Sequence, residues 1–226
     1  MHTQLKCLLV LQLLLLSSLL YAQDIEKQLE ALGLVEIRDI DPTIQVDLMY
    51  ASEDNFVGIN MYGNLTKAYL LPHIAYKLKL AQKELKNDWG EEFSLLIRDA
   101  ARPLSVQRKM YEAVVGTPNS RYVASPNNGG GRHNYGAAVD ITIVYLPSMT
   151  VVDMGSPVDY FGIESHTDNE QDLLDKGLIS QKNYENRCYL NRLMNKQGLH
   201  NIRREWWHFQ EKMSIQEVRK RYQLIP

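Results

Sequence analysis

Apolar residues recur at helical spacing in three stretches of the chain, residues 72–89, 104–115 and 181–196. In such a stretch the apolar positions lie three or four residues apart, which places them on one face of an α-helix. Pro72 stands where a first helical residue would, and Gly90 and Gly198 follow two of the stretches, as glycine commonly does at helix ends. Ser214 and Glu217 have the spacing of a capping box and predict one more helix close to the C-terminus.

Shorter stretches have the patterns of β-strands. The run Phe93–Ile97 is mostly apolar, and a short strand is expected around Ile202–Phe209. The stretch Ala137–Tyr145 alternates, with Val139, Ile141 and Ile143 on one face and Ala138, Asp140 and Thr142 on the other. Asp140 is an acidic residue inside this stretch, which is otherwise suited to burial. A loop over residues 116–132 is rich in Gly, Asn, Ser and Pro, and long loops in compact domains are often functional. No repeat or linker interrupts the alternation, so the pattern predicts a single α+β domain.

The N-terminus has the pattern of a secretory signal peptide. Lys6 precedes an apolar run, and small and polar residues follow at about Ala22. The uninterrupted apolar stretch is shorter than the roughly 20 residues that a membrane-spanning helix requires. We therefore expect cleavage after about Ala22, a secreted or periplasmic protein without a membrane anchor, and a catalytic domain over residues 23–226.

Charge and cysteine content restrict the possible partners and metal ligands. The formal net charge is −2, and no stripe of basic residues is present, so neither nucleic acid nor an anionic membrane surface is an expected partner. Cys188 is the only cysteine beyond the predicted leader, which excludes an internal disulfide in the remaining domain. No Cys-x-x-Cys motif occurs either. Any metal ion must therefore be held by histidine and carboxylate side chains.

Metal-ligating residue types gather in two motifs, one from His133 to Asp140 and one from Glu205 to His208. A catalytic zinc ion takes three protein ligands and keeps a further position for water. The side chains of His133, Asp140 and His208 can supply such a set, which predicts one Zn²⁺ per chain. Glu205 would then act as the general base that takes the proton of the attacking water. Residues three apart point to opposite faces of a regular strand, so the chain must twist, bulge or end between Glu205 and His208.

These motifs resemble the zinc D-alanyl-D-alanine dipeptidases of the hedgehog-like DD-peptidase superfamily. The resemblance rests on His133-x-x-Gly136-x-Ala138-x-Asp140 and Glu205-Trp-Trp-His208, and it extends to three further segments, Tyr50–Gly58, Arg102-Pro103 and Met154–Asp159. It implies a central, mostly antiparallel sheet flanked by helices. It also implies the same zinc ligands and the same general base that the residue types suggest, and a small dipeptide from the cell wall as substrate.

The resemblance implies further roles that spacing cannot reveal. Arg102 matches an arginine that stabilises the oxyanion of the tetrahedral intermediate, and Asp159 matches an acid that binds the free ammonium group of the substrate. Gly131 departs from the family, which commonly has a serine there that helps to hold the substrate carboxylate. Backbone N–H groups of residues 129–131, or the side chain of Arg132, are the alternatives that could replace this serine.

Three functions remain open at this point. The first is a dipeptidase that cleaves D-alanyl-D-alanine, with recovery of wall-derived dipeptide as its role. The second is a peptidoglycan D,D- or L,D-carboxypeptidase that trims stem peptides with the same metal site. The third is a non-catalytic zinc-binding module that has kept the fold. The presence of Glu205 and Arg102 argues against the third.

Overall fold

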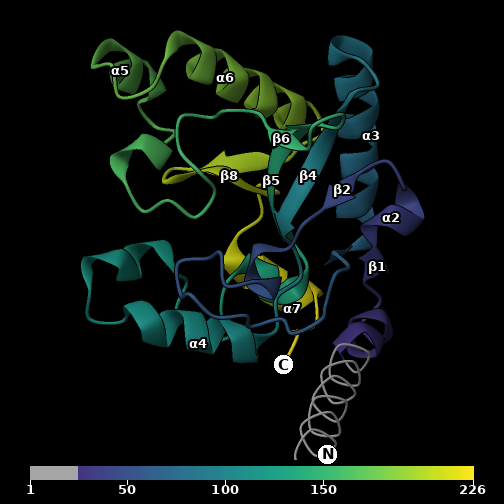
Figure 1. Cartoon of the computed structure of the whole chain (residues 1–226). Helices are drawn as coiled ribbons and strands as arrows, with labels where there is room; N and C mark the ends of the chain where they lie inside the picture. The colour runs from purple at the N-terminus through teal and green to yellow at the C-terminus, as the bar shows by residue number, and fades with distance from the viewer. Residues whose placement is uncertain (1–24) are drawn as a thin grey trace, which may run out of the picture.

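A central sheet organises the computed structural model, which describes residues 25–226. Within this part of the chain the sheet has six strands, with β2, β4, β5, β8 and β7 side by side in that order and β6 paired with β5 (Figure 1). The strands are β2 (Gln45–Val46), β4 (Phe93–Asp99), β5 (Ala138–Tyr145), β6 (Thr150–Val151), β7 (His200–Ile202) and β8 (Glu205–Gln210). The β2–β4 pair is parallel and the other pairs are antiparallel, which confirms the predicted mostly antiparallel sheet.

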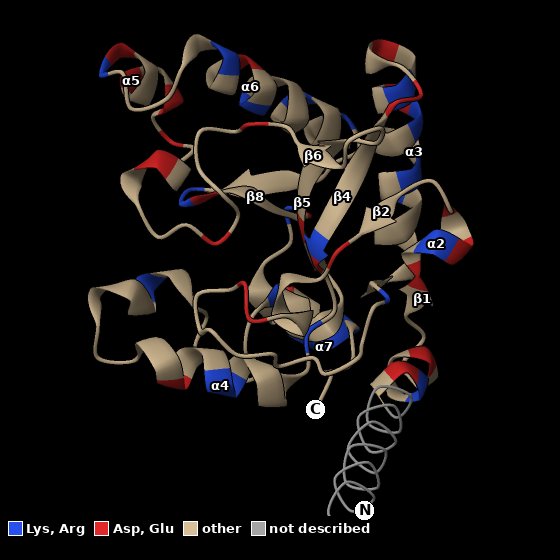
Figure 2. Cartoon of the chain, in the orientation of Figure 1, with Lys and Arg blue, Asp and Glu red and all other residues tan. Residues whose placement is uncertain are grey.

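Helices flank this sheet, as expected for an α+β domain. They are α2 (Ile37–Ile40), α3 (Pro72–Trp89), α4 (Leu104–Val114), α5 (Glu170–Asp175), α6 (Gln181–Lys196) and α7 (Ile215–Arg221). Helix α3 packs against β4 and α6, whereas α4 and α7 lie beyond the lower ends of β4 and β5 (Figure 1). A separate pair of short strands, β1 (Val35–Glu36) and β3 (Tyr69–Leu70), lies next to α3. Basic residues outnumber acidic ones along α3 and α6 (Figure 2).

Local sequence explains where the long helices begin and end. Pro72 is the first residue of α3, and Gly90 follows its last residue with a φ of 107°, a backbone conformation that glycine adopts at little cost. Ile74, Leu78, Ala81 and Leu85, the apolar positions of α3 at helical spacing, are buried. Ser180 and Ser214 cap α6 and α7 by accepting hydrogen bonds from backbone N–H groups of the first turn. These helices confirm the predictions from hydrophobic spacing.

Strand β5 lies at the centre of the sheet and is buried on both faces. Val139, Ile141 and Ile143 belong to the main hydrophobic core and are fully buried. The opposite face carries Asp140, which is only 3% exposed. A carboxylate at such a position requires compensating partners, because burying an unpaired charge is costly. The centre of the sheet is therefore where a charged site is expected.

The structure differs from the sequence prediction in two segments. The stretch predicted as one strand around residues 202–209 forms two antiparallel strands, β7 and β8, because the chain reverses at Arg203 and Arg204. The loop 116–132 contains a turn of 3₁₀-helix, η2 (Pro118–Tyr122). The predicted signal peptide lies outside the described residues. Within residues 25–226, none of the helices combines the length and the apolar character needed to cross a membrane.

Candidate active site

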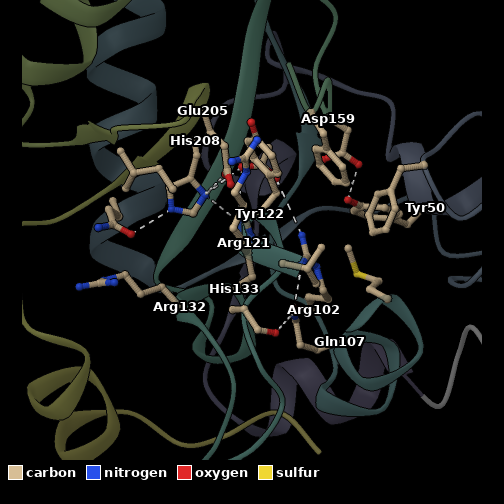
Figure 3. A pocket seen from close by; sticks show the side chains of 18 residues that line it. Tyr50, Arg102, Gln107, Arg121, Tyr122, Arg132, His133, Asp159, Glu205 and His208 are labelled. Carbon is tan, nitrogen blue, oxygen red and sulfur yellow. Dashed lines mark hydrogen bonds and ion pairs between the residues drawn. The ribbon is translucent and has the colours of Figure 1, made fainter. Parts of the chain in front are cut away.

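The three predicted metal ligands meet at the centre of the sheet. Asp140 and His208 are directly opposite each other in the β5–β8 ladder. His133 reaches them from η3 (Arg132–Tyr135), the 3₁₀ turn that precedes β5. All three side chains are buried, and they form the one cluster of potential metal ligands found among the described residues (Figure 3).

The inward-facing atoms of these residues form a nearly equilateral triangle. Nε2 of His133 is 3.1 Å from Nδ1 of His208 and 3.3 Å from Oδ1 of Asp140, and the latter two atoms are 3.1 Å apart. Ligands about 2.0–2.1 Å from a tetrahedral zinc ion lie about 3.3 Å from one another. The neighbouring His133 holds the pKa of Asp140 well below its usual range although burial acts to raise it, so Asp140 is an anionic donor. The donor types and their spacing therefore fit a small divalent metal ion.

Neighbouring groups orient both imidazole rings. Nδ1 of His133 lies 2.8 Å from the carbonyl oxygen of Ala100, and Nε2 of His208 lies 2.9 Å from Oε1 of Gln210. Both partners are hydrogen-bond acceptors, so in the neutral rings each outward nitrogen carries the proton and each inward nitrogen keeps a free lone pair. This is the arrangement that a metal-binding histidine requires.

Glu205 reaches the same centre because the β7–β8 ladder is irregular. Asn201 pairs with Phe209, but the next residue, Ile202, pairs with Glu205, so the register shifts between them. The irregularity places Oε2 of Glu205 3.7 Å from Nδ1 of His208 although the two residues are three positions apart. Burial raises the pKa of Glu205 to about 8, against the opposing influence of His208. A carboxyl group with a pKa near neutral is suited to both accepting and releasing a proton.

Arg102 is held rigidly beside the ligands. Its Nε donates to Oδ2 of Asp99 at 2.9 Å, its Nη2 also donates to that oxygen, and its Nη1 donates to Oε1 of Gln107 at 2.8 Å. Nη2 lies 3.9 Å from Oδ2 of Asp140. The guanidinium group is buried, and the charge of Asp99 keeps its pKa high although burial acts to lower it. A positive charge is thus fixed at the edge of the metal site.

Asp159 closes the other side of the site. Its backbone has a φ of 64°, an uncommon conformation for a residue other than glycine. The hydroxyl of Tyr50 donates to its Oδ2 at 2.5 Å. Burial raises the pKa of the Asp159 carboxyl to about 7, although the hydrogen bond from Tyr50 acts in the opposite direction. The unusual backbone together with the perturbed pKa marks this carboxylate as a functional candidate.

A cavity of about 280 Å³ connects these residues. Its charged part is made by the ligands together with Glu205, Arg102 and Asp159, and its apolar part includes Phe56, Phe161 and Tyr122 (Figure 3). The rings of Tyr122 and Phe161 are stacked with their centroids 4.8 Å apart. The volume suits a small polar molecule with one or two compact side chains.

Gly131 and its neighbours differ in their access to this cavity. The N–H group of Gly131 donates to Oδ1 of Asn134 at 2.8 Å, and a side chain at position 131 would begin 3.1 Å from the Cβ atom of Ala124. Arg132 lines the cavity, and among the described residues its Nε is a buried donor without a hydrogen-bond partner. The N–H group of Gly131 is therefore already used, whereas the side chain of Arg132, whose Nη2 donates to the carbonyl oxygen of Met213 at 2.6 Å, keeps Nε as an unused donor.

A family model described as D-ala-D-ala dipeptidase matches residues 30–224 of the chain. The chain belongs to this family. It is 28% identical to the D-alanyl-D-alanine dipeptidase of Escherichia coli K12 over 180 residues, which cover 78% of this chain and 83% of the relative. The dipeptidase of Enterococcus faecalis V583 is 26% identical over 185 residues, covering 74% and 85% of the two chains. That of Enterococcus faecium is 25% identical over 196 residues, covering 79% and 91%.

Membership of the D-ala-D-ala dipeptidase family makes the chain a hydrolase of the peptidase class. Peptidases of this family depend on a metal, and His133, Asp140 and His208 are the residues that could hold one. The family assignment and the α+β fold confirm the resemblance drawn from the motifs.

Sequence reasoning missed the residues that support the site. Asp99 holds Arg102, Tyr50 holds Asp159, and Gln210 orients His208. Position gave a weak signal for two of them. Asp99 lies two residues beyond the predicted strand Phe93–Ile97 and three residues before Arg102. Gln210 lies two residues after His208, on the same face of β8. Nothing in the local sequence connects Tyr50 with Asp159, which is 109 residues away.

Proposed function

We propose that this chain is a zinc peptidase that hydrolyses D-alanyl-D-alanine or a closely related dipeptide. The observation that carries the proposal is the triangle of ligand atoms from His133, Asp140 and His208, with the carboxylate of Glu205 beside it. The cavity that contains them is bounded on one side by Asp159 and on the other by Arg132. The dipeptidase activity of the named relatives supports the same substrate class.

In this proposal, His133, Asp140 and His208 hold the zinc ion. When bound, zinc supplies a Lewis acid that activates water and polarises the peptide carbonyl. Glu205 accepts the proton of the attacking water and delivers it to the departing amine. The buried position and raised pKa of its carboxyl group suit this shuttle, because the proton is held and then released near neutral pH.

Arg102 stabilises the negative charge that develops on the carbonyl oxygen. Its hydrogen bonds to Asp99 and Gln107 fix the guanidinium before substrate arrives, so no reorganisation is needed during the reaction. The burial of the group strengthens its interaction with a developing charge, since little water screens it.

Asp159 binds the free ammonium group of the dipeptide. A carboxylate at this half-buried position is costly when ionised, and an incoming cation offsets this cost. A substrate with an acylated N-terminus lacks the cation and leaves the carboxylate unpaired. Asp159 therefore selects dipeptides over the blocked ends of longer stem peptides.

The substrate carboxylate is held at the opposite end of the cavity. We assign this contact to Arg132 rather than to the N–H group of Gly131, which is already used by Asn134. The unused Nε of Arg132 supports the assignment. An arginine in place of the family serine provides a charged partner for the carboxylate.

From the predicted signal peptide we propose that the enzyme acts outside the cytoplasmic membrane, where peptidoglycan is turned over. Hydrolysis of wall-derived dipeptide to free alanine is the role that this location favours. Such an enzyme meets both free dipeptides and intact stem peptides, so the selectivity of Asp159 determines its biological effect.

The test uses the chain from residue 23 onward, loaded with zinc, and three substrates: D-alanyl-D-alanine, its N-acetyl derivative and a stem pentapeptide. Release of alanine from the free dipeptide alone supports the proposal. Release from the blocked substrates would instead identify a carboxypeptidase. No release from any of them, with zinc bound, would identify a non-catalytic zinc-binding module.

A further inference from the structure

Helix α6 holds the segment that carries Asp159. The side chains of Asn183 and Asn186 donate to the carbonyl oxygen of Asp153 at 3.1 and 2.9 Å, and Nε of Arg187 donates to that of Met154. These three side chains, at helical spacing on one face of α6, thus bind two consecutive carbonyls of residues 153–159, which we call the 153–159 segment. The start of this segment is fixed to the helix.

The burial of Arg187 is not explained by an ion pair. Its side chain is 1% exposed, and the carboxylate facing it, that of Glu170, is 3.9 Å away without a hydrogen bond to it. Burial of a cation without a hydrogen-bonded counter-ion costs several kcal/mol. An arginine in this position needs a reason other than the stability that an ion pair provides.

Ser156 links this arginine to the strand of the general base. Its Oγ accepts a hydrogen bond from Nε1 of Trp206 at 2.9 Å and lies 3.4 Å from Nη2 of Arg187. The guanidinium also lies over the indole ring of Trp206, 5.7 Å from its centroid. Trp206 directly follows Glu205 in β8. Arg187 and Ser156 therefore join α6, the 153–159 segment and β8 at a single point.

The segment needs such an anchor because its last residue is strained. Asp159 has a φ of 64°, a conformation that costs a residue with a side chain of the order of 1 kcal/mol and persists only when the surroundings impose it. Ser156 is three residues before Asp159. Without the anchor, the segment can relax, and the carboxylate moves relative to Glu205.

We propose that Arg187 is a positioning residue of the dipeptide site. From α6 it sets the distance between the carboxylate of Asp159, which receives the substrate ammonium group, and Glu205, which handles the proton. This inference rests on the proposed function. Arg187 contacts neither the substrate nor the metal in this proposal, and it acts through Asp159.

A double-mutant cycle tests the inference. Arg187→Met removes the donors but keeps an unbranched apolar stem, and we expect the KM for D-alanyl-D-alanine to rise about 10-fold while kcat changes less than about 3-fold and zinc affinity is unchanged. In an Asp159→Asn background the same change should alter KM less than about 3-fold, because the group that Arg187 positions is already gone. Arg192→Met is the control, since Arg192 lies on the same helix with its side chain 69% exposed.

Ser156→Ala provides a second, milder perturbation if Arg187→Met does not fold. It removes the hydroxyl between Trp206 and Arg187, and we expect KM to rise about 3-fold, again only when Asp159 is intact. If the Arg187→Met and Asp159→Asn substitutions have additive effects on KM, or if Arg187→Met lowers kcat alone, the positioning role is overturned. The proposed function is untouched by either result. Absence of dipeptide hydrolysis by the unaltered protein would overturn the proposed function itself, and the inference with it.

Discussion

Replacing Asp159 by Asn should make the protein more stable at alkaline pH and a worse dipeptidase. Asn keeps an acceptor for the Tyr50 hydroxyl and tolerates a positive φ at least as well as Asp. The pKa of Asp159 rises from 3.8 to about 7 on folding, so ionisation of this group opposes folding. At about 1.4 kcal/mol per unit the shift corresponds to about 4 kcal/mol, which screening at this half-buried position reduces to about 2 kcal/mol.

The sign of the effect follows from linkage. Because the folded-state pKa is the higher one, the contribution of Asp159 to stability is fully present below pH 3.8 and is lost as the pH rises to about 7. Without bound metal, the unaltered protein and the Asp159→Asn variant should therefore unfold at similar temperatures at pH 4. At pH 8 the variant should unfold about 4–8 °C higher, since about 1 kcal/mol shifts the midpoint by about 2–4 °C at this size. Differential scanning calorimetry measures both, and an equal or lower midpoint for the variant at pH 8 would refute the reasoning.

Four further outcomes test the remaining parts of the site. Gln210→Leu removes the acceptor that orients His208 and should weaken zinc binding about 10- to 100-fold in competition with a chelator, whereas Gln210→Glu should restore it. Glu205→Gln should lower kcat by at least about 10³-fold while zinc affinity, measured in the same way, stays within about 3-fold, and loss of the metal would mean that Glu205 is a ligand. Arg102→Lys should lower kcat about 10²- to 10³-fold with little change in KM, because a lysine cannot keep the contacts to both Asp99 and Gln107. Arg132→Met should raise the KM for D-alanyl-D-alanine about 10-fold, and an unchanged KM would return the carboxylate contact to the backbone of residues 129–131.

Much of the fold was predictable because the long elements have strong local patterns. Helix α3 has an N-terminal proline, an apolar face and a terminal glycine, and each of these acts over a few residues of chain. The hairpin of β7 and β8 was not predicted, because the pattern of a single short strand gives no information on where the chain reverses. The two adjacent arginines at the reversal are not typical turn residues.

The amino-acid sequence by itself determined the chemical types at the site and the strand that carries Asp140. Metal ligands can be recognised because few residue types bind a metal and because an ionisable residue in an otherwise apolar strand is costly to keep. The sequence also marked Glu205 and His208 as a pair, although their spacing in a regular strand would separate them.

Only the tertiary structure decided how these residues meet. The register shift between β7 and β8 brings Glu205 to His208, the ladder between β5 and β8 places Asp140 opposite His208, and the contact of Tyr50 with Asp159 joins residues far apart in the chain. Strand pairing and register depend on the packing of the whole sheet, since each is selected by burial and by hydrogen bonds between distant segments. Such long-range choices leave no local pattern in the sequence, and the supporting residues of the site become visible only once the chain is folded.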